Sequence, residues 1–131
     1  MEDATNQDHV DQLAEAVIGA AIEVHRALGP GLLESAYEEC LCSELKDRGI
    51  TFERQVAVPV SYKTATLDCG YRLDLLVEKK IILELKAVER LEGIHLAQML
   101  TYLRLSGLRV GYLINFNVRM LKDGIKRVVN G

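Results

Sequence analysis

The hydrophobic period of the chain changes twice, and this change constrains the fold more than any other feature of the sequence. Up to Gly49, apolar residues recur at three- and four-residue spacing, which is typical of helices. Between Phe52 and Val88 they alternate with polar residues, which is typical of strands. The helical period then returns over residues 91–106 before a last apolar stretch. The chain therefore combines helices with a sheet.

The element order follows from these patterns. Gly29-Pro30-Gly31 separates two helices, because glycine suits a left-handed cap and proline cannot continue a helix. Pro59 lacks a ladder donor and predicts an edge position or a bulge. Short turns at 63–65 and 78–79 predict an antiparallel meander. We predict helices over 8–28, 33–48 and 91–106, and strands over 52–62, 67–77, 80–88, 109–116 and 125–129. The order ααβββαβ(β) indicates an α/β or α+β fold with helices covering a mixed sheet.

Length and composition favour one compact soluble domain spanning residues 1–131, with residues 1–9 frayed. The chain is 49% hydrophobic and 27% charged, which is close to average globular usage. The longest uncharged stretch of the most apolar predicted helix falls far short of the ~20 residues that span a bilayer. Met1 is followed by two acidic residues, which excludes a secretory signal. We therefore expect a cytoplasmic protein without membrane contact.

The three cysteines, Cys40, Cys42 and Cys69, form no C-x-x-C pair. Their number and spacing exclude the usual zinc-ribbon and redox motifs. We expect buried free thiols in a reducing compartment.

Charge is distributed unevenly along the chain, although the net charge is only -3. Residues 1–50 carry 3 Lys/Arg against 11 Asp/Glu, whereas residues 100–131 carry 6 against 1. The basic carboxyl-terminal quarter permits contact with nucleic acid, and solvated surface charge explains it equally well.

Charged residues in two neighbouring predicted strands are the strongest candidates for chemistry. Glu84 and Lys86 share one face of their strand, opposite Leu83 and Leu85. In a hairpin that turns at residues 78–79, Asp74 lies near Glu84 across the ladder. Like charges placed so are destabilising unless a cation lies between them. An ion pair on the solvent side of the sheet is the alternative explanation for Glu84 and Lys86.

Two carboxylates beside a lysine fit Mg²⁺ or Mn²⁺ better than zinc, which prefers His and Cys ligands. Lys86 would then hold or activate the attacking water, or neutralise charge that develops on a phosphate. The chemistry that this arrangement favours is hydrolysis at phosphorus.

Further polar residues can reach the same place. Glu34 lies in the first turn of the second predicted helix, where it also complements the helix dipole. His95, Gln98 and Tyr102 form a polar stripe on the third helix, and Gln98 and Tyr102 can donate to a phosphate or to the catalytic water. A half-buried polar helix face without function is the alternative. We interpret His9 and His25 as structural.

The ordered combination of Asp74, Glu84-Leu85-Lys86 and Gln98-Met99-Leu100-Thr101-Tyr102 resembles the PD-(D/E)XK nuclease superfamily, in particular its RecB-like branch with a Q-h-x-x-Y helix motif. Within it, the segment from Gly31 to Tyr37, with Glu34 at its centre, resembles the signature of the GxxExxY protein family. The resemblance covers nearly the whole chain and implies a restriction-endonuclease-like αβββαβ core with an extra N-terminal helix. Leu73 stands where the superfamily's proline would be.

This resemblance implies the role of each site residue. Asp74, Glu84 and the backbone carbonyl of Leu85 would bind Mg²⁺ or Mn²⁺, and Lys86 would be the catalytic lysine. The remaining catalytic positions would be Glu34, Gln98 and Tyr102. With three cysteines at unsuitable spacing, no iron–sulfur cluster is expected.

We therefore expect a Mg²⁺-dependent nuclease that hydrolyses phosphodiester bonds in DNA or RNA. A homodimer would bring two sites to two strands, and partner proteins would supply substrate choice. The alternative is a non-catalytic nuclease-fold module that serves protein assembly or nucleic-acid binding, which the acidic net charge favours. A third interpretation treats Glu84 and Lys86 as a buried pair without metal.

Overall fold

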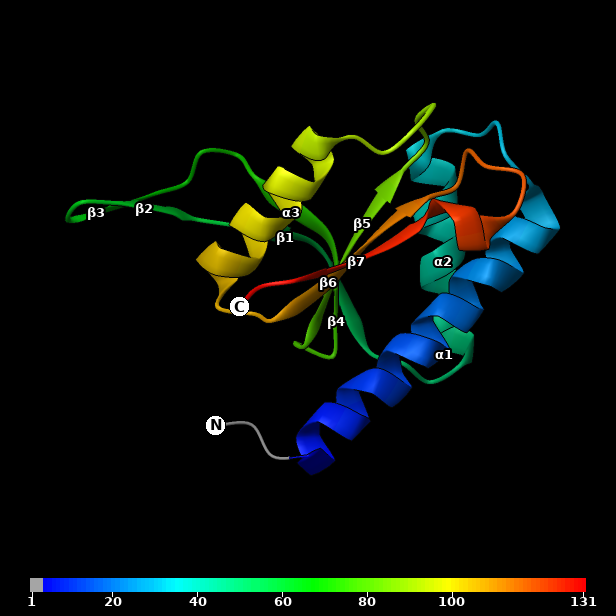
Figure 1. The fold of residues 1–131 in the computed structure, drawn as a ribbon, viewed down its shortest axis with the longest axis horizontal. Helices are drawn as coiled ribbons and strands as arrows, with labels where there is room; N and C mark the ends of the chain where they lie inside the picture. The colour runs from blue at the N-terminus through cyan, green and yellow to red at the C-terminus, as the bar shows by residue number, and fades with distance from the viewer. Residues whose placement is uncertain (1–3) are drawn as a thin grey trace.

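A five-stranded mixed sheet lies at the centre of the computed structural model, which describes residues 4–131 (Figure 1). Its strand order is β1-β4-β5-β6-β7. The strands are Phe52–Ala57 (β1), Arg72–Val77 (β4), Ile81–Lys86 (β5), Val110–Asn115 (β6) and Ile125–Val129 (β7). The β5–β6 pair is parallel and the other neighbours are antiparallel. The predicted fold class and the meander β1-β4-β5 are thus confirmed.

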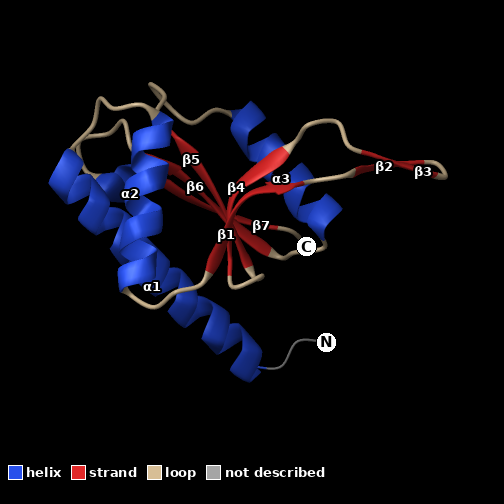
Figure 2. Ribbon diagram, turned by 180° about the vertical axis from the view of Figure 1, so that it is seen from behind, coloured by secondary structure: helices blue, strands red, loops and turns tan. Residues whose placement is uncertain are grey.

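Helices cover both faces of this sheet (Figure 2). Helices α1 (Ala4–Leu28) and α2 (Glu34–Asp47) pack on one face, in a core cluster that contains Leu83 and Leu85 of β5. Helix α3 (Gly93–Ser106) packs on the other, in a cluster that contains Ile82. Because strand side chains alternate, Glu84 lies on the α3 side. Within residues 4–131, none of the helices has the length and apolar character that a membrane span requires.

The first helix starts earlier than its sequence pattern predicts. It begins at Ala4 and not near Asp8. The fraying expected for residues 1–9 stays a prediction, and residues 1–3 lie outside the described part of the chain. A side-chain hydrogen bond from Gln7 to Asp11 (3.1 Å) and packing of Val10 against the core stabilise this first part of the helix. The helix ends before Gly29, whose φ of 69° is the left-handed conformation expected there.

Two predicted strands are each broken in two. Residues 52–62 divide into β1 and β2 (Val60–Tyr62), and residues 67–77 divide into β3 (Ala65–Leu67) and β4. Pro59 interrupts the first, and Gly70, at φ 84°, turns the second. Strands β2 and β3 pair with each other as a separate hairpin that projects from the body (Figure 1).

The cysteine prediction is correct in part, because the cysteines are free thiols but not all are buried. Cys42 is buried, Cys40 is half-buried, and Cys69 is exposed. Cys69 lies in the connection between β3 and β4.

The buried side chain of Asn115 holds the end of β6 against the segment that follows β5. Its amide donates to the Val88 carbonyl (2.9 Å), and its oxygen accepts from the backbone N–H of Val88 (3.0 Å). The Phe116 N–H also donates to the Lys86 carbonyl (2.9 Å). These bonds fix the backbone at Lys86. A 3-10 turn, Leu121–Gly124, follows before β7 and was not predicted.

Candidate active site

Two carboxylates replace backbone groups where the ladder between β4 and β5 ends. Backbone pairing runs from Val77↔Ile81 to Leu75↔Leu83 and stops there. One step further, the Asp74 N–H donates to Oε2 of Glu84, and the Leu85 N–H donates to Oδ2 of Asp74, both at 2.8 Å. The hairpin therefore brings Asp74 and Glu84 together, as its alternation and turn position predict.

Both carboxylates lie in surroundings that disfavour their charge. Glu84 is only 5% exposed. Burial, followed by the neighbouring charge of Asp74, raises the pKa of Glu84 to about 8. Burial also raises the pKa of Asp74, and the Leu85 N–H bond partly offsets that effect. A cation would be stabilising here, because it would favour the ionised forms of the buried Glu84 and the half-buried Asp74 beside it.

Lys86 lies close to the two acids but does not pair with either. Its positive charge lowers the pKa of both Asp74 and Glu84. Within residues 4–131, however, none of the ion pairs shorter than 4.0 Å involves Lys86, Asp74 or Glu84. The ion-pair explanation of Glu84 and Lys86 therefore has no support in this geometry.

The oxygen donors present fit a divalent cation that keeps part of its water shell. In a strand, the N–H and C=O of one residue face the same neighbour, so the Leu85 carbonyl faces Asp74 as its N–H does. Among the described residues there is no group of three or more His, Cys, Asp or Glu side chains suited to enclose a metal. Two carboxylates and a carbonyl with open positions suit Mg²⁺ or Mn²⁺, which are commonly held by one or two carboxylates, waters and phosphate oxygens.

The loop before α2 positions Glu34 beside the end of β5. The Ala87 N–H donates to Oε2 of Glu34 at 3.3 Å. The loop itself is held by the buried Tyr37, whose hydroxyl donates to the Gly29 carbonyl (2.6 Å) and accepts from the Leu32 N–H (3.1 Å). The Tyr37 ring also stacks on Phe116, with centroids 4.4 Å apart. Gly31, at φ 101°, allows the turn that this anchoring requires.

Glu38 also lies near the site, and the sequence analysis missed it. Its negative charge raises the pKa of both Asp74 and Glu84. The carboxylate itself is paired with Arg54 (2.9 Å) and accepts from the Gln55 amide (3.0 Å). The spacing of four residues from Glu34 places both acids on one face of α2, and this is the signal that could have identified it.

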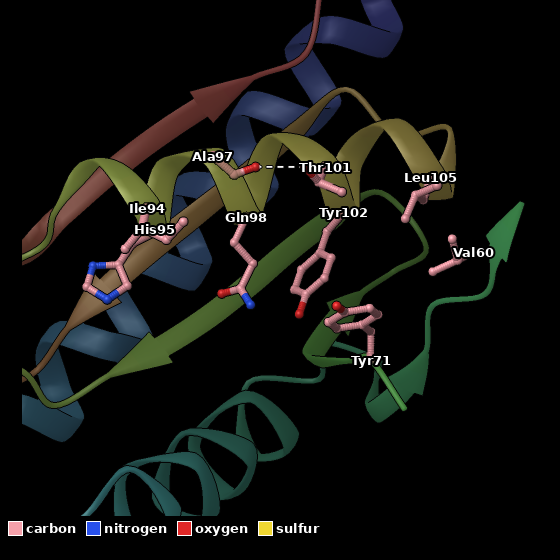
Figure 3. Close-up of a pocket in the computed structure, with 9 residues that line it drawn as sticks. All are labelled: Val60, Tyr71, Ile94, His95, Ala97, Gln98, Thr101, Tyr102 and Leu105. Carbon is pink, nitrogen blue, oxygen red and sulfur yellow. Dashed lines mark hydrogen bonds between the residues drawn. The ribbon is translucent and has the colours of Figure 1, made fainter. Parts of the chain in front are cut away.

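Helix α3 directs Gln98 and Tyr102 toward the sheet (Figure 3), where Tyr102 packs in the same core cluster as Leu73, the residue before Asp74. Burial, then the charge of Glu84, raises the pKa of the Tyr102 hydroxyl, so it stays a proton donor. The Gln98 amide makes no hydrogen bond within the described part of the chain. His95, the third residue of the predicted stripe, instead accepts a hydrogen bond from the Glu92 N–H on its Nδ1 (2.9 Å) at the start of the helix.

His25 lies away from this group. It is buried, and its Nε2 donates to the Val118 carbonyl at 2.8 Å.

Comparison with known proteins gives one match. A family model described as the PD-(D/E)XK nuclease superfamily matches residues 11–128. Neither the curated proteins nor the solved structures include a match to this chain. The matched segment contains every candidate residue described above.

Proposed function

Because the chain belongs to the PD-(D/E)XK nuclease superfamily, we propose that it is a nuclease dependent on Mg²⁺ or Mn²⁺ that hydrolyses phosphodiester bonds in DNA or RNA. The observation that carries this proposal is the buried carboxylate of Glu84 beside the half-buried carboxylate of Asp74, without a cationic partner within 4.0 Å in the described residues. Within the superfamily, Glu34 with Gly31 and Tyr37 supports assignment to the GxxExxY proteins, and Gln98 with Tyr102 supports the RecB-like branch.

The proposed metal ligands are Asp74, Glu84 and the Leu85 carbonyl. A divalent cation at such a site supplies Lewis acidity toward a phosphate oxygen and lowers the pKa of a water. The hydrogen bonds from the Asp74 and Leu85 N–H groups hold the two carboxylates in place before any ligand binds. This preorganisation is what a hydrolytic site needs.

The remaining residues act on the water and on the phosphate. Lys86 lies beside the acids without an ion pair and is therefore free to hold the attacking water and to offset charge on the phosphate. Tyr102 and Gln98 both direct a hydrogen-bond donor from α3 toward the sheet (Figure 3). Glu34, at the start of α2, completes the acidic edge of the site.

A cavity beside this site contains cationic side chains that support nucleic acid as the partner. It has a volume of about 530 Å³ and is lined by Asn115 and by two basic and two acidic residues, Arg90, Lys126, Glu89 and Asp123. Asn115 is the register partner of Lys86, so the cavity lies at the same end of the sheet as the carboxylates. Cationic side chains at that place can hold the phosphates that flank the bond to be cut.

Calorimetric titration with Mn²⁺, followed by cleavage of labelled oligonucleotides, tests the proposal. We expect the parent protein to bind Mn²⁺ and Asp74→Asn to lose binding and cleavage together. Asp68→Asn is the matched control, because Asp68 is an exposed carboxylate in the loop before β4. A parent protein that binds no Mn²⁺, even with DNA present, would contradict the proposal and favour a non-catalytic binding module.

Glu34→Ala is expected to lower the cleavage rate about tenfold while the melting temperature stays within about 2 °C of the parent. Glu34 is exposed and accepts one long hydrogen bond, so little packing is lost with it. Glu39→Ala is the control on the same helix, since Glu39 is exposed and pairs with Arg54 on its outer surface. A large drop in melting temperature for Glu34→Ala, measured by calorimetry, would make its role structural.

A further inference from the structure

A cavity of about 490 Å³ lies between α3 and the segment that leads into β4 (Figure 3). The residues that line it come from β2, from the position just before β4 and from one side of α3, and include Val60, Tyr71, Ile94, Gln98, Tyr102 and Leu105. Within residues 4–131 its lining includes no Lys, Arg, Asp or Glu side chain, and His95 at one end is its only basic group (Figure 3). The rest of the cavity offers a phosphate no cationic side chain, so it suits an uncharged group.

The cavity lies beside the proposed active site. Tyr102, which lines it, packs in the same core cluster as Leu73, the residue before Asp74. Gln98 lines the cavity one turn earlier on α3 (Figure 3). Burial, and then the negative charges of Glu84 and Asp74, raise the pKa of Tyr102. A substrate whose phosphate lies at the carboxylates would therefore reach the cavity with its neighbouring nucleotide.

The walls have the chemistry that recognises a flat heteroaromatic ring. Tyr71 and Tyr102 stand at the cavity with ring centroids 6.1 Å apart and planes inclined by 59°. Tyr71 is 45% exposed and Ile94 is 72% exposed, so both present apolar surface that a ligand could cover. The Gln98 amide, which makes no hydrogen bond within residues 4–131, offers one donor group and one acceptor. Nucleobases bind proteins by stacking on aromatic side chains and by hydrogen bonds to their edges.

We propose that this cavity binds an unpaired nucleobase of the strand that is cut, with Tyr71 as the stacking surface and Gln98 as the edge contact. The inference rests on the proposed nuclease function and names its substrate class. In a duplex the bases are stacked inside, and a base reaches a protein cavity only from a single strand, a frayed end or a flipped nucleotide. The preferred substrate is therefore single-stranded nucleic acid or an unpaired end.

Equilibrium binding tests the cavity separately from catalysis. Fluorescence anisotropy in EDTA, where cleavage is stopped, compares one labelled oligonucleotide as a single strand and as a blunt duplex. We expect the parent to bind the single strand at least tenfold more tightly. Tyr71→Ala should weaken that binding about fivefold or more, the least that loss of one base–aromatic stack costs. Tyr71→Phe keeps the ring and should bind as the parent does.

Tyr62→Ala is the matched control, because Tyr62 is 61% exposed on the β2–β3 hairpin and does not line the cavity. Equal affinity for single strand and duplex, unchanged binding by Tyr71→Ala, or an equal loss in Tyr62→Ala would overturn the inference. A parallel cleavage assay with Mn²⁺ separates the two proposals. If the parent cleaves the oligonucleotide and Tyr71→Ala binds it as the parent does, the base cavity is refuted and the nuclease function is not. If Tyr71→Ala loses binding, Tyr62→Ala keeps it and the parent cleaves nothing, the nuclease function is refuted and the base cavity is not.

Discussion

Replacing Glu84 by glutamine is expected to abolish Mn²⁺ binding and to lower cleavage by more than about 100-fold. The glutamine side chain keeps an oxygen that can accept the Asp74 N–H, so the strand geometry remains. What disappears is the negative charge that, with Asp74, attracts the cation. Calorimetric titration and an oligonucleotide cleavage assay, both near pH 9 where Glu84 of the parent is largely ionised, measure the two losses. Unchanged cleavage by Glu84→Gln would show that Glu84 is not a ligand.

The same substitution should stabilise the protein at alkaline pH. The pKa of Glu84 is about 8 in the folded protein, against an ordinary 4.5. Between these values the folded state binds more protons than the unfolded state, so the free energy of unfolding falls as pH rises, and the loss is complete above about pH 8. Glutamine never ionises. In EDTA, Glu84→Gln should therefore melt at a higher temperature than the parent at pH 9, with the difference shrinking toward pH 5. A lower melting temperature at pH 9 would contradict this expectation.

Lys86→Ala is expected to lower cleavage about 10² to 10³-fold, the effect of removing one group that stabilises transition-state charge. Binding of Mn²⁺ should remain, because Lys86 donates no oxygen ligand. The titration is best made near pH 9, since loss of the Lys86 charge raises the pKa of both acids and increases proton competition at lower pH.

Lys79→Ala is the control for this variant. Lys79 lies in the turn at the opposite end of the β4–β5 hairpin, and its side chain is 85% exposed. We expect Lys79→Ala to cleave as the parent does. Equal cleavage by Lys86→Ala and the parent would refute the catalytic assignment, and loss of Mn²⁺ binding in Lys86→Ala would make its role structural.

Local patterns predicted the part of the molecule in which neighbours along the chain are also neighbours in space. Period-two alternation and a turn at residues 78–79 were enough to predict that Asp74 and Glu84 meet. Gly29 and Gly107 end helices at positions that their conformational freedom predicts. The break of the predicted 52–62 strand after β1 was only partly foreseen from Pro59, because alternation continues through it into the hairpin.

Contacts between distant segments could not be predicted in the same way. Tyr71 falls within the strand predicted over 67–77, and only the position of α3 makes it a wall of the cavity beside Tyr102. Glu38 has the pattern of a surface helix residue, and its influence on Asp74 and Glu84 depends on how α2 packs against β5. Helix-to-sheet packing of this kind depends on the whole core and not on a local period.

The end of the β4–β5 ladder changes what mutational tolerance would reveal about this protein. Backbone pairing accepts any residue type, but here strand pairing depends on the identity of two side chains, because Asp74 and Glu84 accept the N–H groups that a neighbouring strand would otherwise bind. Most replacements at either position would loosen the hairpin whether or not the protein is an enzyme. Intolerance at these two positions is therefore weak evidence for catalysis. The Lys86 side chain makes no hydrogen bond or ion pair within residues 4–131, so its replacement should not disturb the fold. If replacements of Lys86 are not tolerated, this indicates a catalytic role.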